Sequence, residues 1–144
     1  MRPMMERPTI VLGVEMMDQD HLRIERMFEA ASCAPDKDLP ARYRDVAEEL
    51  AAHFAREEDF LREKQFPGLH CHLAQHNVLL AEMAHGERPK FAGGELRRRM
   101  QFILPQLVLS HVTTMDRMAA AFLKGELGQA DFDVLRLPLP GLAE

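Results

Sequence analysis

Apolar residues recur at helical spacing in four stretches of the chain, and the alternation typical of strands is almost absent. The spacing predicts helices from about Asp18 to the residue before Ala34, from Pro40 to about Lys64, from about Leu69 to His85, and from about Glu95 to Gly125. Asp18 would cap the first helix, and Gly86 would stop the third. Pro105 lies inside the fourth pattern and predicts a kink there.

Short segments rich in turn-forming residues separate these patterns, and the clearest is residues 86–94. Four amphipathic helices joined by short loops predict an all-α fold, an antiparallel up-down-up-down four-helix bundle. The buried stripe of the fourth helix would run through Leu104, His111 and Met118. We expect a single domain over residues 1–144, with its core at about 13–125, an N-terminal arm, and a C-terminal tail packed along the bundle.

Ionisable residues occupy positions on these stripes where a bundle core needs hydrophobic side chains. They are His21, His53, Glu57, His72, His76 and His111. A buried ionisable group is costly unless it is paired or bound to a metal ion. One such histidine alone is usually an ordinary core residue, but contributions from every helix predict a shared metal site. Imidazole with carboxylate favours iron, zinc, copper or nickel over calcium and magnesium.

Two common helical metal-binding patterns do not fit this chain. The HExxH sequence does not occur, which excludes that type of metalloprotease helix. Ferritin-like di-iron proteins need Glu-x-x-His on two helices, and only Glu82 with His85 matches here. Five histidines are too many for one tetrahedral ion, so two metal ions bridged by carboxylates fit the residues better.

Four short motifs, in order over about residues 13–122, resemble the hemerythrin family. They are GVEMMDQDH at 13–21, HFAREE at 53–58, Phe66-Pro67 followed by HLAQH at 72–76, and HVTTMD at 111–116. This resemblance implies two non-haem iron ions joined by an oxo or hydroxo bridge, with O2 as the ligand. It also implies a small diatomic partner, O2 or NO.

The resemblance further implies how the metal-binding residues divide between the two irons. One iron would be bound by His72, His76 and His111, and the other, which keeps an open position, by His21 and His53. Glu57 and Asp116 would bridge the two irons. Asp116 rests on the resemblance alone, because five residues of regular helix turn it about 140° away from His111. To reach the other metal-binding residues, Asp116 would need either a local widening of the helix, helped by Pro105, or a sideways approach of its side chain.

The chain also departs from the family pattern around the metal-binding residues. Asp20 stands where the family usually has glutamine, and Leu107 stands where an aromatic residue often occurs. No tryptophan is present. None of these departures replaces a metal-binding residue, but oxygen affinity and autoxidation rate depend on such surroundings. We expect apolar residues to line the open position, and the candidates are Leu22 or Ile24, with Met17 and Met115 nearby.

The leading interpretation is a protein that binds O2 reversibly as a carrier or store. The alternative is an oxygen, redox or nitric-oxide sensor that acts through a separate partner. A di-iron oxidase or peroxidase is the third interpretation, and it ranks last because the sequence supplies no general acid beyond the iron ligands. We therefore do not expect an enzyme.

Composition narrows the partners and the compartment. The net charge of −5 argues against nucleic acid, and no apolar run approaches the roughly 18 residues of a membrane span. Two cysteines and the lack of a signal segment predict a cytoplasmic protein. The sequence does not decide between a monomer and a homo-oligomer, and it leaves open whether the protein has a redox partner. We expect His70 and His85 to be surface residues, and Cys71 to point away from the metals as a packing or surface residue. We also expect the three consecutive arginines at 97–99 to form a solvated face.

Overall fold

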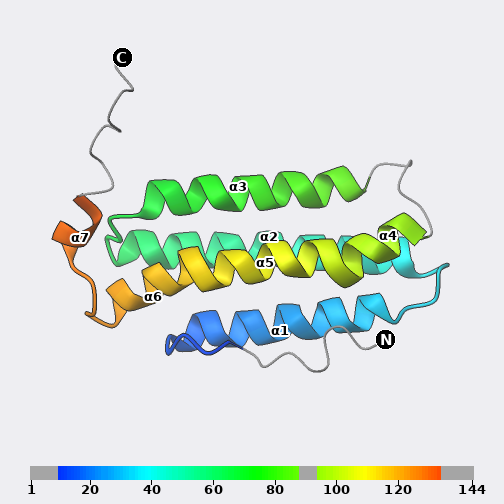
Figure 1. Ribbon diagram of the computed structural model, residues 1–144, viewed down its shortest axis with the longest axis horizontal. Helices are drawn as coiled ribbons and strands as arrows, with labels where there is room; N and C mark the ends of the chain where they lie inside the picture. The colour runs from blue at the N-terminus through cyan, green and yellow to red at the C-terminus, as the bar shows by residue number, and fades with distance from the viewer. Residues whose placement is uncertain (1–9, 88–93, 134–144) are drawn as a thin grey trace, which may run out of the picture.

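The computed structural model describes residues 10–87 and 94–133, and within these ranges it contains helices and no strand. Three of the four long helices are α1 (Glu15–Ser32), α2 (Leu39–Glu63) and α3 (Leu69–Gly86). The fourth bundle helix is continuous and consists of α4 (Gly94–Arg98), the π-helical turn η1 (Arg99–Ile103), α5 (Leu104–His111), the π-helical turn η2 (Val112–Asp116) and α6 (Arg117–Leu123). A short helix, α7 (Gln129–Asp133), follows (Figure 1).

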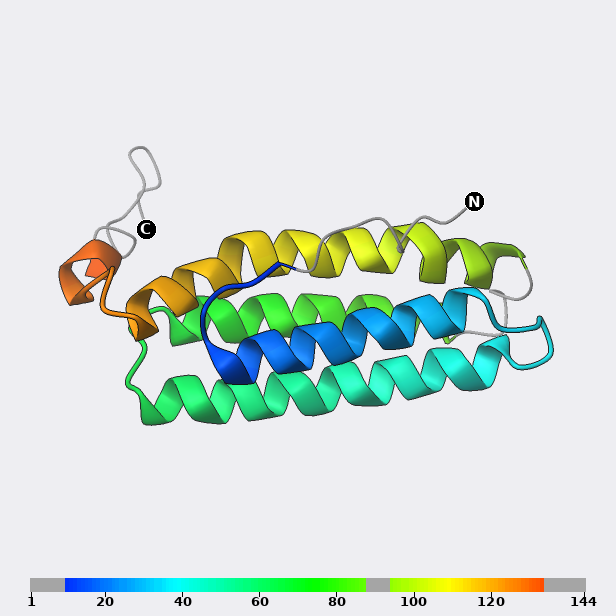
Figure 2. The ribbon, with the colours of Figure 1, turned by 90° about the horizontal axis from the view of Figure 1, so that it is seen from below.

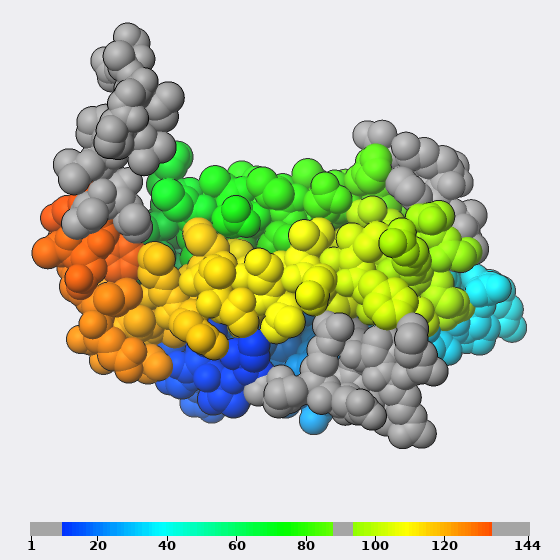
Figure 3. Space-filling model, in the orientation of Figure 1, coloured from blue at the N-terminus to red at the C-terminus, as the bar shows by residue number. Residues whose placement is uncertain are grey.

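The long helices run antiparallel to their neighbours in sequence, which confirms the predicted all-α bundle (Figure 1). Helix α1 packs against α2 and η1, α2 against α3, and α3 against α5. Figure 2 shows residues 10–14 crossing from the start of α1 towards the fourth bundle helix. In Figure 3 that helix forms the middle of the visible face, between α3 and α1.

The core consists of two apolar clusters with ionisable residues between them. Along α2, for example, Leu50 belongs to one cluster and Leu61 to the other, and His53 and Glu57 lie between these leucines. Both leucines are almost completely buried. The polar layer is therefore closed off at both ends of the bundle by hydrophobic packing.

Two helix ends differ from the sequence prediction. Helix α1 begins at Glu15, so Asp18 lies inside the first turn instead of capping it. Its carboxylate accepts hydrogen bonds from the backbone N–H groups of Leu12 and Gly13, at 2.8 and 3.0 Å, and so anchors the preceding arm. Helix α3 ends at Gly86, but this glycine does not adopt the left-handed conformation that is typical of a glycine at a helix end. A Cβ atom there would lie 2.0 Å from the hydroxyl of Tyr43, so the glycine permits close packing.

The helix continues through Pro105, with a widened turn directly before it. Proline has no N–H to donate, so the regular hydrogen-bond ladder is interrupted at that residue. In η1 the Leu104 N–H donates to the carbonyl of Arg99, five residues earlier. The predicted irregularity therefore takes the form of a π-helical turn.

The consecutive arginines do not form one solvated face, and that prediction is wrong. Arg99 is buried, and its guanidinium donates to the backbone carbonyl of Glu82 at 2.7 Å. Arg97 is half-buried and donates to the carbonyls of Ser32 and Ala34, at 2.8 and 2.6 Å. These bonds satisfy carbonyl groups at the end of α1. Of the three side chains, only that of Arg98 is exposed.

The described part of the C-terminal tail packs at the end of the bundle. Phe132 of α7 is buried, and its ring centroid lies 5.1 Å from that of Phe66 and 5.9 Å from that of Phe122. The expected packing along the bundle also concerns residues 134–144, which lie outside the described residues. Among the described helices, none has the length and apolar character needed to cross a membrane.

Candidate metal centre

Each bundle helix places ionisable side chains in the polar layer. Helix α1 supplies His21, and α2 supplies His53 and Glu57 one helical turn apart. Helix α3 supplies His72 and His76 with the same spacing, and the fourth bundle helix supplies His111 and Asp116. Four of the seven, Glu57, His72, His76 and Asp116, have no exposed surface, and the other three are also buried. The structure thus brings all seven residues predicted from the sequence into one layer.

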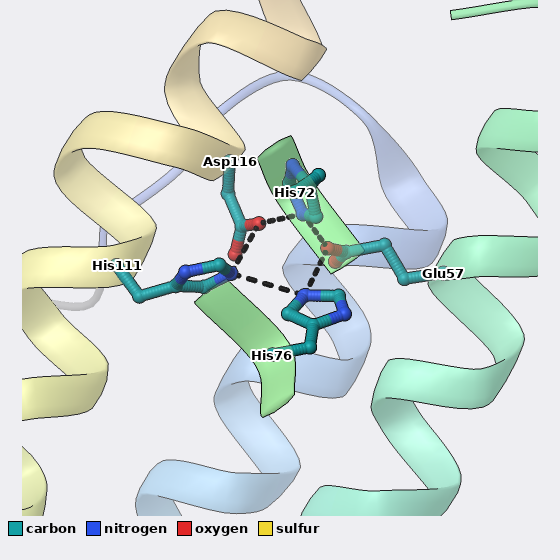
Figure 4. A group of neighbouring side chains, drawn as sticks. All are labelled: Glu57, His72, His76, His111 and Asp116. Carbon is teal, nitrogen blue, oxygen red and sulfur yellow. Dashed lines mark hydrogen bonds and ion pairs between the residues drawn. The ribbon is translucent and has the colours of Figure 1, made fainter. Parts of the chain in front are cut away.

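Five of these residues form a compact set, the five-residue group, whose potential metal-binding atoms all lie within 4.8 Å of one another. The group consists of Glu57, His72, His76, His111 and Asp116 (Figure 4). Nε2 of His72 lies 2.5 Å from Glu57 Oε1 and 3.0 Å from Asp116 Oδ1. Nε2 of His76 and Nε2 of His111 are 3.1 Å apart. Three imidazoles and two carboxylates therefore face one point.

Four residues form a second set, the four-residue group, within the same 4.8 Å limit. It consists of His21, His53, Glu57 and Asp116. Nε2 of His21 lies 2.9 Å from Asp116 Oδ2, and Nε2 of His53 lies 3.3 Å from Glu57 Oε2. Each carboxylate thus presents one oxygen to each group. This geometry suits two metal ions that share Glu57 and Asp116.

The π-helical turn η2 brings Asp116 into the site. Residues in a π-helix are bonded to those five positions away, and in η2 the Arg117 N–H donates to the carbonyl of Val112. Asp116 Oδ1 consequently lies 3.1 Å from His111 Nε2. Local widening of the helix, foreseen as one option, is therefore present. Helix α5 separates it from the widened turn before Pro105, so the two irregularities are distinct turns of the same helix.

Two neighbouring threonines accompany this turn. The hydroxyl of Thr113 donates to the carbonyl of Leu109 at 2.9 Å, and that of Thr114 donates to the carbonyl of Ser110 at 2.7 Å. Such bonds to the preceding turn distort regular helices. The adjacent threonines were the signal in the sequence that could have located the widened turn.

Two further carboxylates contact the outer nitrogens of histidines in the site. Nδ1 of His53 lies 2.9 Å from Asp20 Oδ2, and Nδ1 of His76 lies 2.9 Å from Glu58 Oε1. Histidines that bind metal ions usually donate their other N–H to such a partner, which fixes the ring and the tautomer. In the sequence, Asp20 stands out only as a departure from the family pattern and Glu58 only as part of a motif, so neither contact was predicted.

The buried carboxylates and histidines strongly shift one another's protonation. Burial disfavours protonated His72, but the carboxylates of Asp116 and Glu57 outweigh it and raise its pKa to about 9. Burial would raise the pKa of Asp116, yet the surrounding imidazoles hold it well below the ordinary value. Burial lowers the pKa of His53, against the opposing effect of Glu57 and Asp20. Without metal, His72 and Asp116 therefore form an ion pair.

The donor set fits a pair of cations better than it fits protons. Within the described residues, Glu57 Oε2 and both oxygens of Asp116 are buried and accept no well-directed hydrogen bond, although imidazole nitrogens approach within 3.3 Å. Buried polar atoms without such partners are rare in proteins. Imidazole and carboxylate donors are typical of iron and other transition-metal sites. The residues present thus fit a metal pair.

An apolar cavity of about 90 Å³ adjoins the four-residue group. His21, His53, His111 and Asp116 reach its wall, and the remaining lining is almost entirely hydrophobic. Ile24 lines this cavity, whereas Leu22 lies beside a separate groove near the start of α1. Met17 and Met115 are not among the lining residues either. Of the expected pocket residues, Ile24 alone is in place.

Of the remaining ionisable residues near the motifs, His70 and Cys71 lie where the helical spacing predicted, whereas His85 is less exposed than expected. His70 and Cys71 are both exposed, although each is within two positions of the buried His72. His85 is half-buried near the end of α3. None of these three belongs to the five-residue or the four-residue group.

Comparison with known proteins agrees with this geometry. The model of the hemerythrin HHE cation binding domain matches residues 12–123. The chain belongs to this family. It is 31% identical over 114 residues to a protein named bacteriohemerythrin from Ralstonia nicotianae, covering 78% of this chain and 82% of that protein. A bacteriohemerythrin from Stenotrophomonas maltophilia is 25% identical over 122 residues, covering 82% and 80%. No solved structure matches the chain significantly.

Membership of the hemerythrin family confirms the resemblance seen in the four motifs. At the level of the family, the chain is a non-haem iron protein of the oxygen-binding type. The matched residues contain both groups of candidate metal-binding residues and every bundle helix. The family and the cluster of histidines and carboxylates therefore point to the same part of the molecule.

Proposed function

We propose that this single four-helix domain holds two iron ions and binds O2 reversibly, as a carrier or store. His72, His76 and His111 would bind one ion, His21 and His53 the other, and Glu57 and Asp116 both. The observation that carries the proposal is the pair of groups sharing two carboxylates, beside a cavity that both histidines of the four-residue group reach. When bound, a ferrous pair with an oxo or hydroxo bridge would supply two electrons for reversible binding of O2.

The protein's own residues would provide a dry and mostly neutral environment for that chemistry. Ile24, Phe28 and Val108 belong to the wall of the cavity, and such apolar side chains would limit the access of water to the open side of the site. The volume of about 90 Å³ is adequate for a diatomic ligand and too small for most metabolites. Such a cavity supports binding of a small apolar ligand, rather than conversion of a larger substrate.

The proposal is tested by metal analysis and by one spectroscopic cycle. Purified protein should contain about two irons per chain. After anaerobic reduction, exposure to O2 should produce a visible absorption band that disappears under vacuum and returns with O2. The variant His70→Ala serves as a matched control, because this exposed histidine on α3 should leave both results unchanged. One zinc per chain, or an O2-induced band that cannot be reversed, would overturn the proposal.

A further inference from the structure

The outer nitrogen of His53 is held by a charged residue on the neighbouring helix. Asp20 of α1 is only 5% exposed and reaches across to α2, where its Oδ2 lies 2.9 Å from Nδ1 of His53. An ionised carboxylate can only accept a hydrogen bond, so Nδ1 of His53 must carry the proton. Nε2 then keeps its lone pair on the side of the ring that faces Glu57, 3.3 Å away.

Asp20 is itself fixed by two arginines. Nε of Arg56 donates to Asp20 Oδ2 at 3.1 Å, and the guanidinium of Arg23 donates to Asp20 Oδ1. Both arginines also donate to Glu49 Oε1, at 2.9 Å each. Burial would raise the pKa of Asp20, but its bonds with His53 and Arg56 lower it. Asp20 is therefore a charged acceptor that cannot easily turn away from His53.

No equivalent arrangement occurs elsewhere among the described residues. Glu58 accepts from Nδ1 of His76, but no arginine of the described chain pairs with it. Nδ1 atoms of His21, His72 and His111 are buried and have no hydrogen-bond partner in the described residues. Within the four-residue group, His53 is thus the histidine whose Nδ1 contacts a network of charged side chains, through Asp20.

We propose that Asp20 is a positioning residue for the four-residue group, which fixes the Nδ1–H tautomer of His53 and makes its Nε2 a stronger electron donor. The tautomer follows from the contacts of the protein alone. The effect on a metal ion rests on the proposed function, in which His53 binds the iron with the open position. A carboxylate behind a metal-bound histidine increases the basicity of the ring, and replacing such partners typically costs about 10–100-fold in metal affinity.

The first experiment measures the tautomer of His53 without metal, by ¹⁵N NMR of metal-free protein. Wild type should show Nδ1 protonated and Nε2 unprotonated. Asp20→Asn should keep this tautomer, because the amide oxygen accepts the same bond without charge, and Asp20→Ala should allow both tautomers. Asp59→Asn is the matched control, since Asp59 lies on the same helix as His53, is 81% exposed and pairs only with Arg62 among the described residues. An Nε2–H tautomer in wild type would overturn the proposal.

The second experiment measures metal affinity and reduction potential of the iron-loaded protein. Asp20→Ala should weaken one of the two iron sites about 10–100-fold and leave the other unchanged. Asp20→Asn should retain both irons and shift the potential upward, because a neutral acceptor stabilises the ferric form less. Equal loss from both sites, or an unchanged potential in Asp20→Asn, contradicts the assigned role. The tautomer result stands apart from O2 binding, so failure of one proposal is distinguishable from failure of the other.

Discussion

The five-residue and four-residue groups share Glu57 and Asp116 and differ in what surrounds them. In the five-residue group the three imidazole rings contact one another, and Phe54 stacks on His76 with ring centroids 3.9 Å apart. In the four-residue group both histidines, His21 and His53, reach the wall of an apolar cavity, whereas of the three histidines in the five-residue group only His111 does. One half of the site thus has three histidines, and the other has two histidines that both border space for a small ligand. The difference teaches that the helices determine where the candidate metal-binding atoms gather, and that the cavity gives the two groups unequal surroundings.

The largest effect should come from the shared carboxylate. Glu57→Gln preserves the size of the side chain but removes the charge that both groups use. We expect loss of both irons, with affinities reduced by more than about 100-fold, since the loss of a direct ligand exceeds that of its supporting partner. Elemental analysis after dialysis checks this. Retention of one iron would show that the two groups are more independent than their geometry indicates.

A smaller effect, confined to one half, is expected from His76→Ala. This buried residue belongs to the five-residue group alone, so its loss should remove one iron and leave the other. The buried polar groups that lose their contact with His76 should also lower the free energy of unfolding by about 1–3 kcal/mol. Metal analysis and chemical denaturation measure both results. His70→Ala, on the same helix but exposed, should change the stability by less than about 0.5 kcal/mol.

The pH dependence of stability should reveal the ion pair in the five-residue group. The pKa of His72 is raised from 6.5 to about 9 in the folded protein without metal. The resulting stabilisation is complete below pH 6.5 and is lost as the pH rises through 9, on the order of 3 kcal/mol. Denaturation curves of metal-free protein at pH 6 and pH 9.5 test this. With iron bound, His72 is already deprotonated, so the loss should disappear.

The smallest effect on the metal content, and a selective effect on the ligand, is expected from Ile24→Thr. This substitution places a hydroxyl in the wall of the cavity and touches no metal-binding residue. Iron content should stay at the wild-type level, while the oxygenated form should decay several-fold faster because water enters. The decay of its absorption band measures this lifetime. Leu22→Thr is the control, because Leu22 lies two positions away on α1 and outside the cavity.

The helices and most of the metal centre could be predicted because regular helical spacing determines them. His53 with Glu57, and His72 with His76, are one turn apart, so their shared face follows from the sequence alone. The resemblance supplied Asp116, which a regular helix would have turned away. Helical spacing therefore locates a side chain only where the helix is regular, and the fourth bundle helix is irregular directly before Asp116.

The same assumption placed Met118 on the buried stripe, and that prediction is wrong. Met118 is 37% exposed, whereas Ala119 and Ala120 are almost completely buried. The widened turn η2 adds one residue to the helix, so every later position faces a direction that regular counting assigns to its neighbour. The partners of the outer histidine nitrogens were also not predicted, because no spacing along the chain indicates that Asp20 of α1 contacts His53 of α2.

In genetic terms, the turn η2 equals one extra codon in an otherwise regular helix. Deleting Thr113 or Thr114 would leave His111 and the following aspartate four positions apart, which is one regular turn. The alanines that follow would keep facing the core, because they already occupy the directions of a helix one residue shorter. The same deletion between His53 and Glu57 would instead rotate the rest of α2 by about 100°. The fourth bundle helix is thus the place where this gene can lose a codon and keep the fold.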